Sequence, residues 1–140
     1  RGGAGGPPPL PPPAAGEEQP RPSVLSVEVL AACRGTLLPD PAQDAVLAVA
    51  IALQDPRVET PHAAVRLLLV RDDSCERLAL PRLGLEDSVL CDWCGSERGL
   101  FRAFISAVHE ADPDLLVGFE VQGASLGFLA DRYRVVMDDG

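Results

Sequence analysis

The feature that most constrains the fold is a short apolar run that ends in glycine and leads into a helical pattern. Residues 115–117 read Leu-Leu-Val, which is long enough for one buried strand, and Gly118 follows them. Pro113 ends any helix before this run, because proline disfavours the helical conformation of its neighbours. From residue 122 to Tyr133, apolar residues recur at helical spacing. Since α/β proteins usually place their chemistry where a strand feeds a helix, the stretch from Asp112 to Arg132 predicts an α/β fold with its candidate site at this junction.

Earlier in the chain, three apolar runs predict strands. Residues 24–29 place Ser26 and Glu28 among Val and Leu, and residues two apart on a strand face the same side. Residues 45–53 are wholly apolar, a pattern that fits a buried strand or a buried helix, and we take the strand. Residues 64–70 form the third run. The short connections between these runs predict an antiparallel meander.

A helix is expected between the strands and the junction. Ser96 suits its N-cap position, and Pro113 lies just beyond its expected end. One face carries an apolar stripe made of Leu100, Phe101, Phe104, Ile105 and Val108. His109 near the end of this helix is expected to face solvent, where its charged form suits the helix C-terminus. Residues 74–95 have mixed polarity without a clear period, so no element is predicted there.

The N-terminal segment has a composition that does not favour a packed core. Residues 1–22 contain eight prolines and five glycines, and Leu10 is their only large apolar residue. Such a segment cannot bury enough apolar surface to offset the entropy of ordering it. We therefore expect residues 1–22 to be a disordered linker and residues 23–140 to be the folded domain. The run PPPLPPP also fits a polyproline ligand of aromatic grooves, an alternative that we rank lower.

The charge balance excludes some classes of partner. The net charge is −9, and all 12 basic residues are arginines. The part of the chain after residue 22 carries the whole excess, with 19 acids against 10 arginines. A free-standing nucleic-acid binder normally shows a basic footprint, so tight autonomous DNA binding is not expected. The longest apolar run, residues 45–53, is too short for the roughly 18 residues of a membrane span. The first residue is Arg rather than Met, and we expect the chain to be part of a longer protein.

Residues 118–129 carry a family resemblance. Their sequence GFEVQGASLGFL resembles the second exonuclease motif of family B DNA polymerases, G-Y-N-I-x-x-F-D-x-P-Y-L. Gly118 and Leu129 match that motif, whereas its Asn falls on Glu120 and its metal-binding Asp falls on Ser125. In the zeta branch of the family the motif reads approximately G-Y-E-I-Q-x-x-S-W-G-Y-L, which this sequence follows more closely. The resemblance therefore points to a branch in which the metal ligand of this motif is a serine.

Two further segments support the resemblance. The first exonuclease motif, Asp-x-Glu, falls on Ser26-Val27-Glu28. Residues 34–41, RGTLLPDP, are similar to the R-G-x-x-x-P-D-P segment of the zeta branch. Together these matches imply a ribonuclease-H-like exonuclease fold of order β-β-β-α-β-α. The third exonuclease motif and the last strand of that fold are not found before residue 140, so we expect the fold to be truncated at its C-terminus.

The resemblance also implies how the site positions would act. An active exonuclease of this class holds two divalent metals, which need anionic oxygen ligands. Here hydroxyls replace two of the expected acids, at Ser26 and Ser125, and Glu28 remains. We therefore expect no catalytic residue, no metal site and no cofactor, although Ser26, Glu28 and Ser125 are expected to converge. Glu120 has two possible roles, as a substitute ligand or as a cap for the following helix, and we favour the cap.

The cysteines form one pair at metal-binding spacing. Cys91 and Cys94 can supply half of a zinc site, but Cys33 and Cys75 stand singly and provide no second pair. Without a secretory signal, four cysteines are expected to be reduced thiols. His62 lies in a loop and carries no signal of its own. Ordinary thiols are therefore favoured over a zinc or redox site.

At the level of the whole protein, the resemblance implies a nuclear translesion DNA polymerase. This domain would have an architectural role in that protein, with DNA bound by the parent polymerase, magnesium used by the parent, and accessory subunits as further partners. Two alternatives stay open on sequence grounds. One is an active metal-dependent exonuclease with rearranged ligands. The other is an acidic α/β interaction module that matches the motifs by chance.

Overall fold

A computed structural model describes residues 21–58, 64–70 and 89–138 of the chain. The element order in this part is four strands, a helix, a strand and a helix. The predicted disordered segment, residues 1–22, lies outside the described residues except for Arg21 and Pro22. Within the described part, no helix has the length and apolar content needed to cross a membrane.

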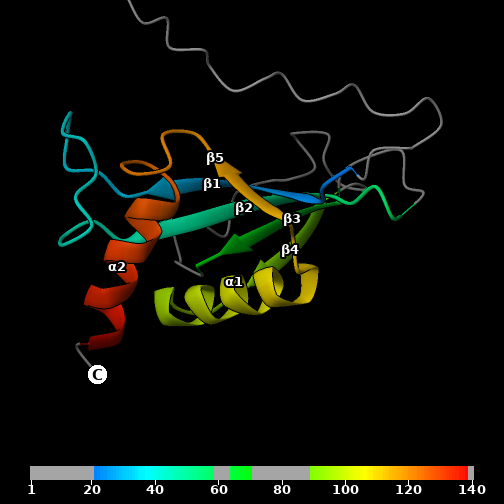
Figure 1. Ribbon diagram of the computed structural model, residues 1–140. Coiled ribbons are helices and arrows are strands. Elements are labelled where there is room, and N and C mark those ends of the chain that lie inside the picture. Colours follow the sequence, from blue (N-terminus) through cyan, green and yellow to red (C-terminus); the bar gives the residue numbers. More distant parts are fainter. Residues whose placement is uncertain (1–20, 59–63, 71–88, 139–140) are drawn as a thin grey trace, which may run out of the picture.

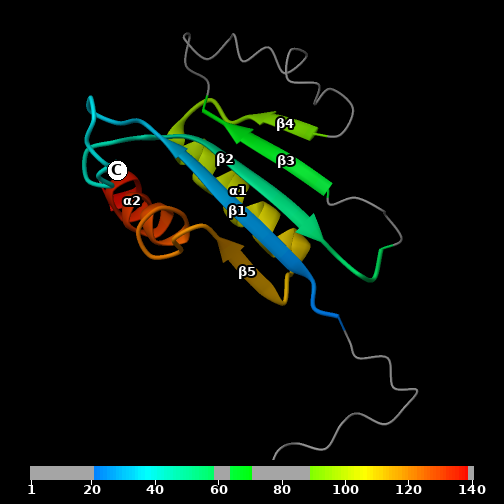
Figure 2. The ribbon, with the colours of Figure 1, turned by 90° about the horizontal axis from the view of Figure 1, so that it is seen from above.

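The strands form a single five-stranded sheet in the order β4-β3-β2-β1-β5. The sheet begins with an antiparallel meander of β1 (Val24–Ala31), β2 (Val46–Gln54) and β3 (Ala64–Leu69), as the sequence predicts. β5 (Leu115–Gly118) runs parallel to β1 and forms one edge of the sheet, as Figure 2 shows. The stretch predicted to feed the candidate site is therefore hydrogen-bonded to the first strand.

The structure adds a strand that the sequence does not predict. β4 (Val89–Trp93) pairs in parallel with β3 and forms the other edge of the sheet. The predicted order β-β-β-α-β-α is thus corrected to β-β-β-β-α-β-α. No residue of β4 is fully buried, and its side chains show no alternation between buried and exposed faces. An edge strand of this kind lacks the period-two apolar signal by which strands are recognised.

Two helices pack against the same face of the sheet, below it in Figure 1. α1 (Glu97–Ala111) begins at Ser96, whose Oγ accepts a hydrogen bond from the Gly99 N–H at 3.1 Å, so the predicted N-cap is confirmed. α2 (Leu126–Asp138) leaves the sheet at the carboxyl end of β5. The core between sheet and helices is mainly aliphatic and is built from Leu25, Val27, Val46, Val49, Ile51, Leu68, Leu100, Phe101, Ala107, Phe128 and Leu129.

The start of α2 differs from the sequence prediction. The helix begins at Leu126 rather than near residue 122, because residues 119–125 form successive turns. The backbone carbonyl of Glu120 accepts hydrogen bonds from the N–H groups of Gly123 and Ala124. Glu120 itself has a φ of 44°, a left-handed conformation that interrupts helical geometry. The turn delays the helix and places Ser125 immediately before its first residue.

The opposite end of the β1–β5 pair is tied by a reciprocal hydrogen-bond motif. The Ser23 N–H and Oγ both donate to Asp114 Oδ2, at 2.7 and 2.9 Å, and the Asp114 N–H donates to Ser23 Oγ at 2.9 Å. These bonds hold the pKa of Asp114 below its usual value, because they favour the ionised carboxylate. The register of β5 against β1 is therefore fixed before the two strands reach the candidate site.

Candidate functional site

The first-motif residues lie on β1, on the face that points away from α1. Leu25 and Val27 are buried in the core, so the alternation of a strand places Ser26 and Glu28 on the opposite face. The Glu28 side chain is exposed and that of Ser26 is partly buried. The predicted sharing of one face by Ser26 and Glu28 is thus confirmed, and the only carboxylate of the pair is open to solvent.

The second-motif residues meet β1 at a very close approach. Gly118 pairs with Val27 across the parallel β1–β5 ladder. A Cβ at position 118 would stand 2.5 Å from Ser125 Oγ and 2.8 Å from the Val27 carbonyl oxygen. These distances are far below van der Waals contact, so only glycine fits between β1 and the start of α2. This steric demand explains why the apolar run 115–117 ends in glycine.

The Ser125 hydroxyl does not share a face with the Ser26 and Glu28 side chains. Paired residues of a parallel ladder project to the same side of the sheet, so the open position at Gly118 lies on the side of Val27, which is the core side. Ser125 Oγ fills this position, and the residue is only 1% exposed. The elements of the two motifs are therefore adjacent, whereas the predicted convergence of all three side chains is not observed.

The buried hydroxyl also lacks a partner. Ser125 Oγ makes no hydrogen bond in the described structure. A buried polar atom without a partner costs on the order of 1–3 kcal/mol. Serine at this position therefore neither supplies an anionic ligand nor completes a local hydrogen-bond network.

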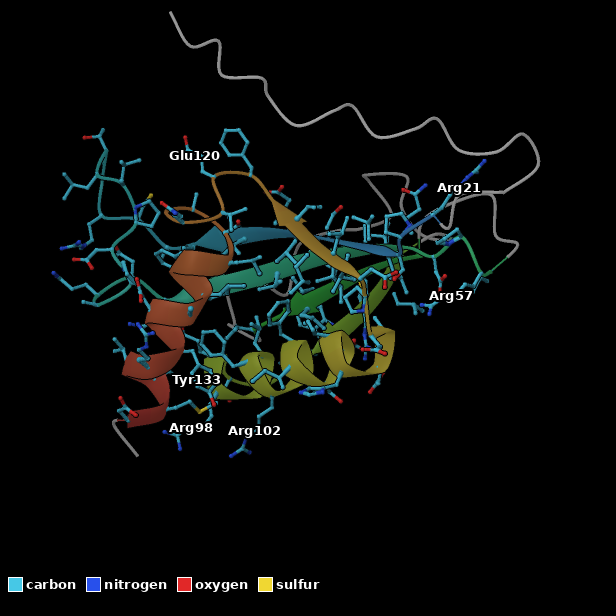
Figure 3. The ribbon with its side chains drawn as sticks, viewed as in Figure 1. Arg21, Arg57, Arg98, Arg102, Glu120 and Tyr133 are labelled. Carbon is cyan, nitrogen blue, oxygen red and sulfur yellow. The ribbon has the colours of Figure 1, made fainter. Side chains whose placement is uncertain are left out.

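Glu120 does not cap α2 through its side chain, so the predicted cap is wrong. Its carboxylate makes no hydrogen bond to the part of the chain that the structure describes, and the turn is closed by its backbone carbonyl instead. Figure 3 shows Glu120 on the turn beyond the end of β5, on the far side of the sheet from the helices. The side chain is exposed at the site rim, where it is free to meet solvent or a partner.

These residues do not fit a pair of divalent cations. In the described residues, no group of three or more His, Cys, Asp or Glu side chains is placed to hold a metal ion. Of the three positions where the family resemblance expects acids, only Glu28 has a carboxylate, whereas Ser26 and Ser125 carry hydroxyls that project to opposite sides. Hard divalent cations require several anionic oxygens at one point, a demand that one carboxylate does not meet.

The cysteines show no disulfide or metal arrangement in the described residues. Cys33 is exposed, Cys91 and Cys94 are partly buried, and all three are free thiols. Burial raises the pKa of Cys94, which keeps its thiol protonated and unreactive. Cys75 and His62 lie outside the described residues. His109 is exposed in the last turn of α1, as predicted.

A partly buried ion pair lies near the site, and the sequence pattern does not predict it. Glu97 and Arg132 form a two-point ion pair, with Arg132 Nε 2.8 Å from Glu97 Oε1 and Nη2 2.9 Å from Oε2. Glu97 Oε1 also accepts the Val46 N–H at 2.6 Å, and Arg132 Nη1 donates to the Pro41 carbonyl at 3.1 Å. We call these four residues the clasp. It joins α1, α2 and the β1–β2 connection, and no local sequence pattern marks a pair 35 residues apart.

The β1–β2 connection is ordered by a second cluster. Asp44 is almost fully buried; its Oδ1 accepts from Arg34 Nε at 3.0 Å and its Oδ2 accepts from the Asp40 N–H at 2.8 Å. The Asp40 N–H and the Arg34 guanidinium together hold the pKa of Asp44 below its usual value, against the opposing effect of burial. Residues 34–41, the segment that resembles R-G-x-x-x-P-D-P, thus form a loop between β1 and β2, and Arg34 and Asp40 fix its shape through Asp44.

Comparisons with known proteins place this geometry in a family. The family described as DNA polymerase family B, exonuclease domain, matches residues 8–138. The chain is 40% identical over 111 residues to the DNA polymerase zeta catalytic subunit of Arabidopsis thaliana, a match that covers 79% of the chain and 6% of that protein. It is 30% identical over 131 residues to the protein of the same name in Homo sapiens, covering 84% of the chain and 4% of that protein. The chain thus spans only a small part of these relatives.

A solved structure has the same fold. The family B DNA polymerase of the archaeon Pyrobaculum calidifontis superposes with a TM-score of 0.56 at 21% sequence identity, over 84% of this chain and 12% of that one. The predicted ribonuclease-H-like exonuclease fold is therefore confirmed, with β4 as an addition to the predicted order. A chance match of the motifs in an unrelated acidic module is excluded by the family match.

Proposed function

This chain belongs to the exonuclease domain family of family B DNA polymerases, and we propose that it is a degenerate member with an architectural rather than a nucleolytic role. The observation that carries this proposal is the composition of the motif positions. Ser26 and Ser125 stand where the family resemblance expects acids, and their side chains lie on opposite sides of the sheet. Glu28 is left as the only carboxylate among the three, and one carboxylate does not balance the charge of two divalent metals.

The rest of the site is well ordered, which supports an architectural role. The Ser23–Asp114 bonds fix one end of the β1–β5 pair, and the tight Gly118 approach fixes the other. The clasp secures α2, the helix that would carry the missing ligand. The domain therefore keeps the scaffold on which exonuclease chemistry is built, while the carboxylates of that chemistry are absent from Ser26 and Ser125.

We further propose that the whole protein is a translesion DNA polymerase. The relatives quoted above are each named DNA polymerase zeta catalytic subunit. On this proposal the parent polymerase binds DNA, uses magnesium for nucleotide addition, works in the nucleus and associates with accessory subunits. The net charge of −9 supports contact with DNA through the parent rather than through this domain, since phosphates are repelled by an acidic surface.

A nuclease assay tests the proposal. The purified chain is incubated with a 5′-labelled single strand in magnesium or manganese, and Glu28→Ala and a chelated reaction serve as controls. We expect no metal-dependent shortening by the wild type, by Ser26→Asp or by Ser125→Asp, because metal ligands act as a unit and one restored acid is not sufficient. Cleavage by the wild type that Glu28→Ala abolishes would establish the alternative, an active exonuclease with rearranged ligands.

A further inference from the structure

A hollow lies between the two helices, on the side of the sheet opposite Ser26 and Glu28. It has a volume of about 190 Å³ and an almost wholly apolar lining. Its lining residues are Phe101, Phe104, Ile105, Leu126, Leu129, Ala130 and Tyr133. We call this hollow the α1–α2 groove. Figure 1 shows the N-terminal end of α1 beside the middle and lower part of α2, and the Glu97–Arg132 ion pair and the hydrogen bond from Arg98 to the Val136 carbonyl join the helices there.

The floor of the groove is fixed, and its walls are accessible. Phe101 and Leu129 are buried, and the Phe101 ring meets the Tyr133 ring edge-on with centroids 5.6 Å apart. The walls keep apolar surface in solvent, with Ile105 39% and Tyr133 37% exposed. An exposed apolar hollow of this kind, rimmed by polar groups, is typical of a site that binds another protein segment.

The rim of the groove carries unusual charges for this chain. Arg98 and Arg102 lie one turn apart on α1, and neither is within 4 Å of a carboxylate in the part of the chain that the structure describes. Arg98 donates to the Val136 carbonyl at 2.8 Å, and Arg102 is exposed. Five other arginines of the described residues form ion pairs, namely Arg34, Arg57, Arg66, Arg132 and Arg134. Figure 3 shows Arg98 and Arg102 side by side below Tyr133.

The chain has a net charge of −9, but Arg98 and Arg102, which have no carboxylate partner in the described residues, form a small positively charged patch. Because they flank an apolar groove, the chemistry that complements this surface is apolar in the middle and acidic at the edge. We propose that the α1–α2 groove docks a protein segment, helical in form, that presents apolar side chains at helical spacing and acidic residues toward Arg98 and Arg102. The segment's leucine-sized side chains fill the groove, and its carboxylates pair with the two guanidinium groups.

A nucleic acid is a poorer occupant of the same surface. Its phosphates match the two arginines, but the only side-chain hydrogen-bonding group among the lining residues is the Tyr133 hydroxyl, and the acidic remainder of the chain repels the backbone. The proposal also stands apart from the nuclease question, because the groove is lined by none of the four candidate site residues Ser26, Glu28, Glu120 and Ser125. Failure of the proposed function in the nuclease assay would leave the groove untouched, and the reverse is equally true.

Binding of designed peptides tests this inference on the complete 140-residue chain. The probe is a fluorescent helical peptide of about five turns, with leucines along one stripe and glutamates elsewhere. A second probe replaces every glutamate with lysine, and unlabelled single-stranded DNA serves as a competitor. We expect saturable binding of the glutamate peptide, at least about tenfold weaker binding of the lysine peptide, and no displacement by DNA.

Variants of the chain locate the binding surface. The double variant Arg98→Glu, Arg102→Glu should bind the glutamate peptide about tenfold or more weakly than the wild type does. It should bind the lysine peptide more tightly, since the rim charge is reversed. Ala130→Phe should weaken the binding of both peptides, because the larger side chain fills the groove from an exposed position. Arg57→Glu is the control, since Arg57 is an exposed arginine at the opposite end of the sheet in Figure 3.

Circular dichroism shows whether each variant keeps its fold. A variant that loses its fold is replaced by Arg102→Gln, which changes only an exposed side chain. The inference is overturned if the glutamate peptide does not bind, if the charge-reversed or groove-filled chain binds it as well as the wild type does, or if DNA displaces it.

Discussion

The clasp and the β1–β5 junction, where Gly118 meets Val27 and Ser125, are two largely buried regions in which polar groups are treated in opposite ways. In the clasp, the Glu97 carboxylate meets a two-point guanidinium and a backbone N–H, and every contact is between 2.6 and 3.1 Å. At the junction, the Ser125 hydroxyl is buried without a hydrogen-bond partner in the described structure. In the clasp the buried polar atoms have hydrogen-bond partners, whereas at the junction the Ser125 hydroxyl has none.

The difference shows where this chain uses its charges. Carboxylates and arginines around α1, α2 and the β1–β2 connection hold elements together, as Glu97, Arg132 and Asp44 do. The backbone has an exonuclease fold, including the close approach at Gly118, and Glu28 is the only acid among the three positions where the family resemblance expects acids. On the proposal made above, the fold preserves the shape of the site without its chemistry, because packing and catalysis depend on different atoms.

Breaking the clasp should give the largest effect on stability. Arg132→Ala leaves the Glu97 carboxylate, only 15% exposed, without its guanidinium partner. Removing one partner of a buried pair costs about 3 kcal/mol or more, because an uncompensated charge stays buried. The free energy of unfolding is measured by urea denaturation. Arg134→Ala is the matched control, since its pair with Asp131 is exposed, and a loss below about 0.5 kcal/mol is expected there. Equal losses in the two variants would show that the clasp does not stabilise the fold.

Crowding the junction should give the next largest effect. Gly118→Ala places a methyl group 2.5 Å from Ser125 Oγ and 2.8 Å from the Val27 carbonyl oxygen, so β5 or α2 must shift. Overpacking of this kind costs about 1–3 kcal/mol. Gly123→Ala is the control, because a Cβ there meets no atom within 4 Å. If Gly118→Ala proves as stable as Gly123→Ala in urea denaturation, the close approach of β1 and α2 is wrong.

Removing single hydroxyls should give smaller effects of opposite sign. Ser125→Ala deletes a buried hydroxyl that has no partner, so the free energy of unfolding should stay the same or rise by about 0.5–1 kcal/mol. Ser96→Ala deletes the N-cap of α1, and the free energy of unfolding should fall by about 1 kcal/mol. Thermal denaturation of the two variants side by side measures the contrast. A clear loss in Ser125→Ala would reveal a hydrogen bond at the junction.

The acid dependence of stability should be the mildest effect. The pKa values of Asp44 and Asp114 are lowered in the folded chain by hydrogen bonds to their ionised forms. Such groups stabilise the fold above their unfolded pKa of about 3.9, and the contribution disappears as the pH falls through the folded pKa. Stability should therefore decline below about pH 4, and Asp44→Asn should flatten that decline. Gly118→Ala, which titrates nothing, should lower stability at every pH and leave the slope unchanged.

Much of the fold could be predicted from the sequence, because its strands and first helix have strong periodic signals. The meander and the N-cap at Ser96 follow from apolar runs and capping residues, whereas the proximity of β1 and β5 is implied by the family resemblance alone. β4 was missed because an edge strand with no fully buried side chain has no such signal. The predicted start of α2 is wrong because Glu120 has a left-handed backbone conformation, which the residue type does not predict.

The candidate site was predictable in its position and less so in its orientation. The motif spacing identified Ser26, Glu28 and Ser125, and the register of β1 and β5 brings their backbones together. Which side of the sheet the Ser125 hydroxyl takes depends on the turn at residues 119–125, and that geometry is set by tertiary packing. The clasp could not be predicted from the sequence either, since Glu97 and Arg132 come together only when the two helices pack in the folded chain.

Metal binding tests the central claim most directly. The purified chain is titrated with Mn²⁺, and the free ion is followed by electron paramagnetic resonance, with Glu28→Ala and Glu120→Ala as controls. The account predicts only weak, nonspecific binding that is the same in all three proteins, because Glu28 faces solvent alone and Ser125 is turned to the core side. A tight, stoichiometric Mn²⁺ site in the wild type that either glutamate substitution removes would contradict it.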